Sequence, residues 1–198
     1  MRPDYDAIVQ MIEPGANVLD LGCGKGDLLA LLVKERGVKA QGIDLREESI
    51  YECVEKGLTV MHGDIEGGLG QFPDKSFDYV ILNQSMQETR NVEFVLKEAL
   101  RVGKMAIIGF PNMCHWRARV DVFFRGRTPI SPALPYRWHN TPNVHFLSLK
   151  DFEEFCQAKN LKVLSRAGLT STGPARFWPN LFGESAVYKI SAGDIFSL

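Results

Sequence analysis

The stretch Leu19-Asp20-Leu21-Gly22-Cys23-Gly24-Lys25-Gly26 decides the fold of this chain. It completes a short apolar run that begins at Asn17, and a helical pattern over residues 26–36 follows it. Glycines allow a backbone to turn sharply and to approach a ligand closely. The first turn of a helix offers free N–H groups and a partial positive charge. A strand, a glycine loop and a helix in this order predict a ligand site at the loop.

The spacing of the glycines indicates which ligand is favoured. A dinucleotide site of the form Gly-x-Gly-x-x-Gly would need a third glycine where Asp27 stands. No Lys-Ser or Lys-Thr pair follows, which excludes the phosphate loop of an NTPase. Asp20, near the end of the strand, would repel a pyrophosphate and suits the ammonium of an amino-acid moiety.

Two further acids follow the next two predicted strands. Asp44 closes a strand over residues 39–45, where a carboxylate can accept hydrogen bonds from ribose hydroxyls. Asp64 follows a strand over residues 58–61, where an adenine amine would lie. A single acid on a loop is usually just solvated. Three acids after three successive strands predict an adenosyl site.

Strand and helix patterns alternate through the rest of the chain. Short Val, Ile and Leu runs followed by helices predict buried parallel strands in a doubly wound α/β fold. Two later strands without a helix between them predict an antiparallel pair at the sheet edge. The further strands are expected at residues 77–82, 104–110, 161–166 and 186–190, and the further helices at 46–56, 91–102 and 149–159.

The first half of the chain resembles the class I S-adenosylmethionine (SAM)-dependent methyltransferases. The motifs that carry the resemblance are LDLGCGKG, GIDL (residues 42–45), GDIE (63–66) and FPDKSFDYVILNQ (72–84). The resemblance implies a Rossmann-like, mostly parallel seven-stranded sheet with an antiparallel terminal strand. It also implies SAM or S-adenosylhomocysteine (SAH) as the cofactor, bound by Asp20, Gly22, Gly24, Gly26, Asp44, Leu45, Asp64, Ile65 and Asn83.

The second half is similar to the MetW family of methionine biosynthesis proteins. PYRWHNTPNVHFLSLKDFEEF (residues 135–155) and FWPNLFGESAVYKIS (177–191) carry this similarity. It implies a partnership with MetX-type homoserine O-acetyltransferase, which the chain would support as an accessory or regulatory protein. The alternative is a methyltransferase that acts on a small molecule.

No catalytic residue can be assigned from the sequence. Amine-directed nucleic-acid methylases of this fold carry Asn/Asp-Pro-Pro-Tyr/Phe where this chain has Asn83-Gln84-Ser85-Met86. Gln84 and Gln87 are either pocket-lining residues or polar loop residues. The histidines His139 and His145 are either a general base or side chains that hold a loop.

An insertion at about residues 112–147 interrupts the pattern, and loops of this length usually act as lids or binding loops. Residues 113–140 carry five arginines against the single acid Asp121, with aromatic residues between them. One interpretation is a helix with its aromatics inward. The other is a protein-binding surface, because Arg, Trp and Tyr are common interface anchors. RNA binding would use the same residue types and is the weakest alternative.

The composition of the chain limits the number of domains and the kinds of partner that we expect. The 198 residues, 45% hydrophobic and 24% charged, predict a single domain over residues 1–198. The net charge of -1 gives no general attraction to nucleic acid, and no apolar run would span a membrane. The cysteines at 23, 53, 114 and 156 lie far apart, so we expect reduced thiols in a cytoplasmic protein and no metal site.

Overall fold

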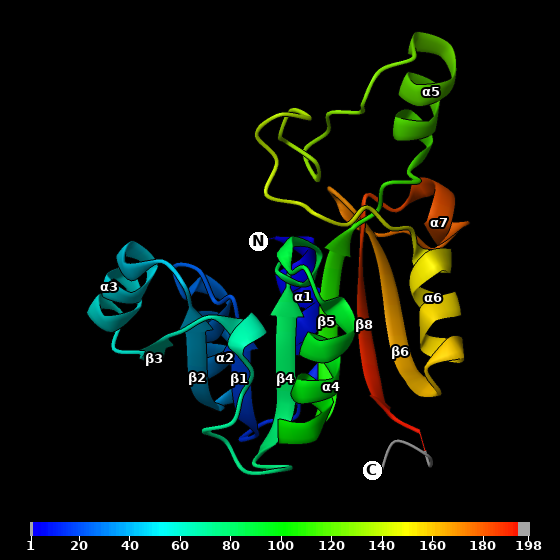
Figure 1. The fold of residues 1–198 in the computed structure, drawn as a ribbon. Helices are drawn as coiled ribbons and strands as arrows, with labels where there is room; N and C mark the ends of the chain where they lie inside the picture. The colour runs from blue at the N-terminus through cyan, green and yellow to red at the C-terminus, as the bar shows by residue number, and fades with distance from the viewer. Residues whose placement is uncertain (1, 194–198) are drawn as a thin grey trace.

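The computed structural model describes residues 2–193, so Met1 and residues 194–198 of the predicted domain lie outside the described residues. One mixed sheet runs through this part of the chain in the order β3-β2-β1-β4-β5-β8-β6-β7 (Figure 1). Its strands are β1 (Asn17–Leu21), β2 (Lys39–Asp44), β3 (Thr59–His62), β4 (Phe77–Asn83), β5 (Gly103–Pro111), β6 (Leu161–Thr170), β7 (Gly173–Pro174) and β8 (Ser185–Ala192).

The sheet confirms the predicted class and nearly the predicted strand count. β1 to β5 are parallel, and β8 runs antiparallel to both β5 and β6. The described chain has eight strands rather than seven, because the two-residue β7 pairs with the end of β6. Such a short pairing leaves no alternating pattern by which the sequence could predict it.

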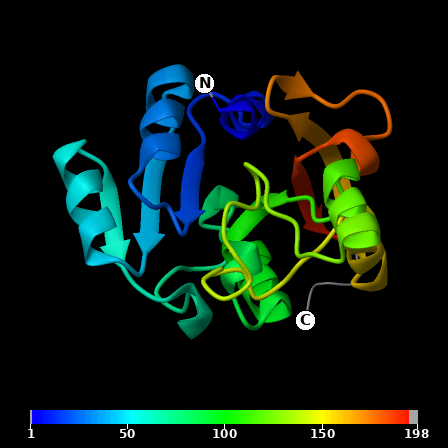
Figure 2. The same cartoon turned by 90° about the horizontal axis from the view of Figure 1, so that it is seen from above.

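Helices cover the two faces of the sheet (Figures 1 and 2). Leu96, Leu100 and Phe152 pack against one face, and Ile8, Ile12 and Leu32 against the other. The helices are α1 (Pro3–Met11), α2 (Asp27–Arg36), α3 (Glu47–Glu55), α4 (Val92–Val102), α5 (Trp116–Arg125), α6 (Leu149–Ala158) and α7 (Pro179–Phe182), with 3-10 turns η1 (Ile65–Gly67) and η2 (Met86–Glu88).

Helix α1 was not among the expected elements. Its sequence signals are Pro3 in the first turn, the acids Asp4 and Asp6 near the positive helix end, and Ile8 and Ile12 one turn apart. The helix packs on β8, β6 and α2. It therefore brings the start of the chain to the edge where the parallel strands end.

The insertion lies over that same edge of the sheet (Figure 2). It contains α5, of which only Ala118 is buried. The inward-facing interpretation is wrong for this helix, because 80% of Phe123 and 75% of Phe124 are exposed. No helix or strand of the described residues packs against these rings closely enough to cover them.

Of the helices in residues 2–193, none combines the length and the apolar character that crossing a membrane would need.

Candidate functional site

The glycine loop between β1 and α2 turns sharply through a left-handed backbone, a conformation that glycine adopts readily. Gly22, Gly24 and Gly26 have φ values of 78°, 53° and 74°. A Cβ on Gly22 would lie 2.7 Å from Cβ of Ser85, and one on Gly26 would lie 2.5 Å from Cδ1 of Leu58. At Gly24 the nearest such atom is an Arg46 guanidinium nitrogen at 3.6 Å. Two glycines therefore serve packing, and Gly24 leaves space above the loop.

Asp44 joins this loop to the end of β2. Its carboxylate accepts hydrogen bonds from the Gly24 N–H at 2.7 Å and the Arg46 N–H at 3.0 Å. The Arg46 guanidinium also lies 3.3 Å from the same carboxylate. The side chain is buried, yet a carboxylate has about four lone-pair sites. Acceptor capacity therefore remains for a ligand hydroxyl.

Asp20 is the buried acid beneath the loop, with 3% of its surface exposed. Burial, and secondarily the charge of Asp44, raises the pKa of Asp20 to about 7. A cation placed beside Asp20 would stabilise its ionised form. When ionised, Asp20 and Asp44 therefore give the loop region a negative potential, which suits an ammonium and disfavours a phosphate.

The raised pKa of Asp20 predicts a pH-dependent loss of stability. An aspartate in an unfolded chain titrates near pH ~3.9. Between that pH and the folded pKa of about 7, the folded state binds more protons, so this group makes stability fall as pH rises. Asp20→Asn, which mimics the protonated form, should raise the melting temperature at about pH 8 and change it little at about pH 4.

A suitable contrast is Asp78→Asn. The Lys104 ammonium and the Asn17 N–H lower the pKa of Asp78, so that variant should be destabilised at about pH 8. Melting curves of both variants at the two pH values show whether each substitution raises or lowers the melting temperature as expected. A lower melting temperature for Asp20→Asn at the higher pH would contradict the assignment.

The other expected cofactor residues are spread along the same edge of the sheet. Leu45 follows β2 and is 62% exposed, and Asp64 is exposed where β3 has ended. Ile65, in η1, packs against the core. The side chain of Asn83 forms no hydrogen bond with the glycine loop or with Asp44. Its amide nitrogen donates to Asp4 at 2.9 Å, and its amide oxygen lies against Gly109.

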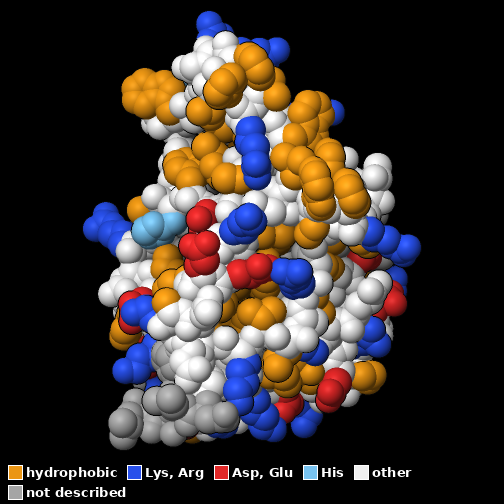
Figure 3. Space-filling model, turned by 90° about the vertical axis from the view of Figure 1, so that its right-hand side faces the viewer, with side chains coloured by type: hydrophobic (Ala, Val, Ile, Leu, Met, Phe, Trp, Pro, Cys, Tyr) orange, Lys and Arg blue, Asp and Glu red, His pale blue; other side chains and the backbone are white. Residues whose placement is uncertain are grey.

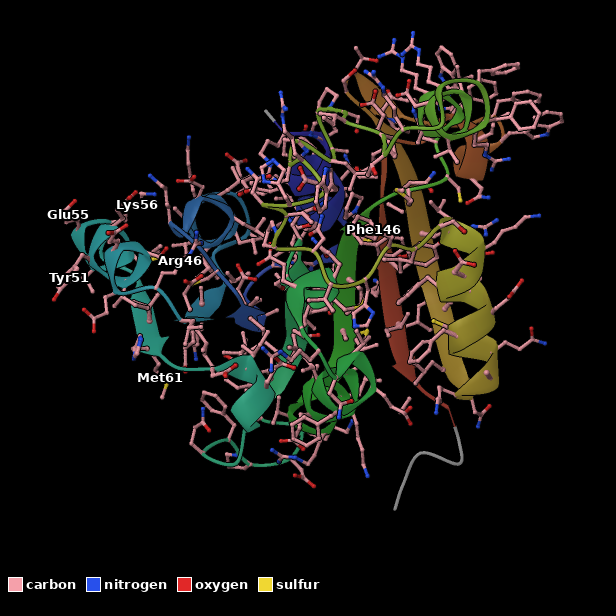
Figure 4. The ribbon with its side chains drawn as sticks, turned by 45° about the horizontal axis from the view of Figure 1, so that its top comes forward. Arg46, Tyr51, Glu55, Lys56, Met61 and Phe146 are labelled. Carbon is pink, nitrogen blue, oxygen red and sulfur yellow. The ribbon has the colours of Figure 1, made fainter. Side chains whose placement is uncertain are left out.

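Three residues of this region were missed by the sequence analysis. Arg46, which is labelled in Figure 4, pairs with Asp44, and Ser85 donates from its hydroxyl to the Leu21 carbonyl at 2.6 Å. Asp4, on α1, accepts the hydrogen bond of the Asn83 amide at the end of β4. The pairing of Arg46 could have been predicted from the sequence, because its positive charge stands two positions after the carboxylate of Asp44. The contacts of Asp4 and Ser85 join segments far apart in the chain and leave no local pattern.

The thiols near the loop are structural. Cys53 lies 3.2 Å from the Gly24 carbonyl, and burial raises the pKa of both Cys23 and Cys53. All four cysteines are free. Within residues 2–193, no group of three His, Cys, Asp or Glu side chains is arranged to hold a metal ion.

Solved structures share this architecture. A SAM-dependent methyltransferase from Mesorhizobium loti matches 95% of the chain with a TM-score of 0.70 and 15% identity, and 97% of its own length is covered. One from Archaeoglobus fulgidus matches 94% of the chain with a TM-score of 0.69 and 17% identity, with 90% of its length covered. The fold is that of the class I SAM-dependent methyltransferases.

The family follows from sequence similarity. The family model described as methionine biosynthesis protein MetW matches residues 2–190, and the chain belongs to this family. The bifunctional methionine biosynthesis protein MetXA/MetW of Rhodopirellula baltica is 36% identical over 172 residues, which are 82% of the chain. The chain spans only 28% of the length of that relative.

Proposed function

We propose that the protein binds SAM or SAH on the open side of the glycine loop, within one domain over residues 1–198. Asp20 would receive the ammonium of the methionyl part, and Asp44 the ribose hydroxyls. Leu45, Ile65 and Asp64 would border the adenine. Asn83 would act indirectly, since its amide is bonded to Asp4. The open side of Gly24 beside the buried carboxylate of Asp44 is the observation that supports this proposal best.

Asp44→Ala should weaken SAH binding by about tenfold or more. A hydrogen bond to a charged group contributes roughly 1.5–3 kcal/mol, and 1.4 kcal/mol is about tenfold in affinity. The substitution also removes the acceptor of the Gly24 N–H, so the loop loses a support. Calorimetric titration with SAH measures the effect. Asp44→Asn, which keeps one side-chain oxygen, should lose less, and an unchanged affinity in both variants would remove Asp44 from the ribose site.

The protein's role, in this proposal, is to support homoserine O-acetyltransferase as an accessory or regulatory partner. Support comes from the MetXA/MetW relative, whose name assigns both parts to one bifunctional protein. Two activities joined in one chain act at a fixed high effective concentration, which favours partners that work together.

An exposed set of aromatic and arginine side chains fits this partnership. We call it the aromatic–arginine surface. It lies at one end of the molecule, on the insertion and on the residues just before α7, and Figure 3 shows hydrophobic and basic side chains intermixed there. Trp and Arg side chains of this kind are the usual anchors of protein interfaces. The surface comprises Trp116, Arg117, Arg119, Phe123, Phe124, Arg125, Arg127, Arg137, Trp138, Phe177 and Trp178, all exposed.

The test is the homoserine O-acetyltransferase assay with and without this protein. We expect co-purification of the two proteins and a change in the rate of acetyl transfer. Repeating the assay with SAH tests regulation, because SAH must bind the free and complexed forms differently if it changes docking. No binding and no rate change would overturn the partnership.

The second candidate function is methyl transfer to a small molecule. A cavity of about 550 Å³ that Gln84 and Gln87 line after β4 favours a ligand near the end of that strand. Methyl transfer needs mainly in-line positioning of a nucleophile, so the absence of an assigned base does not decide against it. Incubation with labelled SAM and a metabolite extract would reveal a methylated product.

A further inference from the structure

The side chain of Arg46 lies at the open side of the glycine loop. One guanidinium nitrogen is 3.6 Å from the position that a Cβ on Gly24 would take, and Nε is 3.3 Å from the carboxylate of Asp44. The space beside Gly24 and the carboxylate at the end of β2 are the two features on which the proposed cofactor site rests. Arg46 therefore stands where the ribose of SAM or SAH would bind.

The hydrogen bonds of Asp44 show what this position means for a ribose. A carboxylate has about four acceptor sites, roughly two on each oxygen. Oδ1 accepts from the backbone N–H of Arg46 at 3.0 Å and from its Nε–H at 3.3 Å. Oδ2 accepts from the Gly24 N–H at 2.7 Å. About one acceptor site is left, on Oδ2, whereas the ribose brings two hydroxyl donors. One of the present donors must leave before Asp44 can accept from both hydroxyls.

The guanidinium is the donor that can leave. The N–H groups of Gly24 and Arg46 belong to backbone that the glycine loop and the start of α3 hold in place. The Arg46 side chain, in contrast, is 71% exposed, while that of Asp44 is 5% exposed. An arginine with this exposure is hydrated when it releases its partner, and an exposed ion pair contributes little to stability. Release of the guanidinium therefore costs less than a movement of the loop.

A second acid is available to the released guanidinium. Burial raises the pKa of Glu88, and the positive charge of Arg46 opposes this rise. Glu88 belongs to η2, the turn that follows β4, whereas Asp44 ends β2. The charge of Arg46 therefore acts on acids of two different elements at this edge of the sheet. After leaving Asp44, the guanidinium can remain at the border of the site, close to Glu88.

We infer that Arg46 competes with the ribose for Asp44: its guanidinium holds an acceptor that one ribose hydroxyl needs, and the ribose must displace it to bind. The inference rests on the proposed cofactor site and adds to it a residue that lowers the affinity. Removal of the guanidinium therefore strengthens the binding of SAM or SAH. An arginine that contacted the ligand favourably would have the opposite effect when removed.

Calorimetric titration of SAH into Arg46→Met tests the competition. Methionine keeps an unbranched apolar side chain but lacks the charge and the donors. SAH carries no net charge, so the loss of a cation from the protein changes its long-range attraction little. We expect the affinity to rise about fivefold, which corresponds to roughly 1 kcal/mol for an exposed ion pair. An unchanged or lower affinity would overturn the inference.

Arg166→Met is the matched control. Arg166 is exposed on β6, far from β2 in the sheet, and pairs with Glu153. This variant should bind SAH as the native protein does, and thermal melting shows whether both variants fold. The gain in Arg46→Met should also shrink as the salt concentration rises, because salt screens exposed ion pairs. An equal gain in Arg166→Met would assign the effect to the overall charge and exclude the competition.

A double-mutant cycle shows whether Arg46 acts through Asp44. Asp44→Asn keeps one side-chain oxygen but carries no charge, so it should hold the guanidinium only weakly. Arg46→Met should therefore change the affinity for SAH much less in the Asp44→Asn background than in the native background. An equal gain in the two backgrounds would show that Arg46 acts through another contact, and the competition for Asp44 would be wrong.

The same titrations separate this inference from the proposed cofactor site. SAH binding to the native protein and to Arg46→Met with equal affinity would overturn the competition and leave the cofactor site standing. SAH binding to Arg46→Met alone would support both. If SAH binds neither protein, the cofactor site is wrong, and the competition is wrong with it.

Discussion

Gly24→Val should abolish measurable SAH binding while the chain still folds. The added side chain would fill the open space above the loop, where its nearest neighbour is the Arg46 guanidinium at 3.6 Å. We expect at least about a hundredfold loss in affinity, or roughly 2.7 kcal/mol. The positive φ of 53° adds backbone strain, because L side chains rarely adopt it. Calorimetry and thermal melting on one sample separate the two effects.

Gly15→Val is the matched control for that strain. Gly15 has a φ of 75°, and a Cβ there would meet nothing within 4 Å. Its melting temperature should fall about as far as that of Gly24→Val, with SAH binding retained. Gly22→Val and Gly26→Val would not serve, because their side chains would collide with Ser85 and Leu58 and disturb packing. Normal binding by Gly24→Val would show that the glycine loop is not the cofactor site.

Trp138→Ala and Trp178→Ala should each weaken docking on homoserine O-acetyltransferase by about thirtyfold. Truncating an interface anchor of this type often costs roughly 2 kcal/mol or more. The two side chains are 77% and 64% exposed, so their removal leaves no cavity in the core. Trp178 stacks on Phe177 with ring centroids 5.0 Å apart, which holds it in a defined position. Titration of the acetyltransferase into each variant measures the loss.

Tyr51→Ala provides the control for a lost exposed aromatic ring. Tyr51 is 69% exposed on α3, at the opposite end of the sheet (Figures 1 and 4). Its removal should leave docking unchanged. If neither tryptophan variant weakens docking, the partner binds elsewhere. Retention of the native protein on RNA, with a steep dependence on salt, would instead assign the surface to nucleic acid.

Local patterns in the sequence determined most of the fold. Short apolar runs separated by helical patterns predicted β1, β2, β4 and β5 to within about one residue, because each strand is buried on both faces and so carries no alternation. The helix over residues 149–159 was predicted from Ser148, which forms a capping box with Asp151. The loop glycines were identified by their spacing, since each occupies a backbone conformation that glycine adopts most readily.

Tertiary structure decided what those patterns could not contain. The Asp4–Asn83 hydrogen bond joins residues 79 positions apart, and the pKa of Asp20 depends on what buries it. Phe123 lies in an amphipathic helix that suggests an inward face, yet no partner element exists within residues 2–193 to cover it. The closeness of the Arg46 guanidinium to Gly24 likewise arises from packing between the β2 end and the glycine loop. Such properties belong to contacts between distant segments, and a local sequence pattern records propensity and burial but not which segments meet.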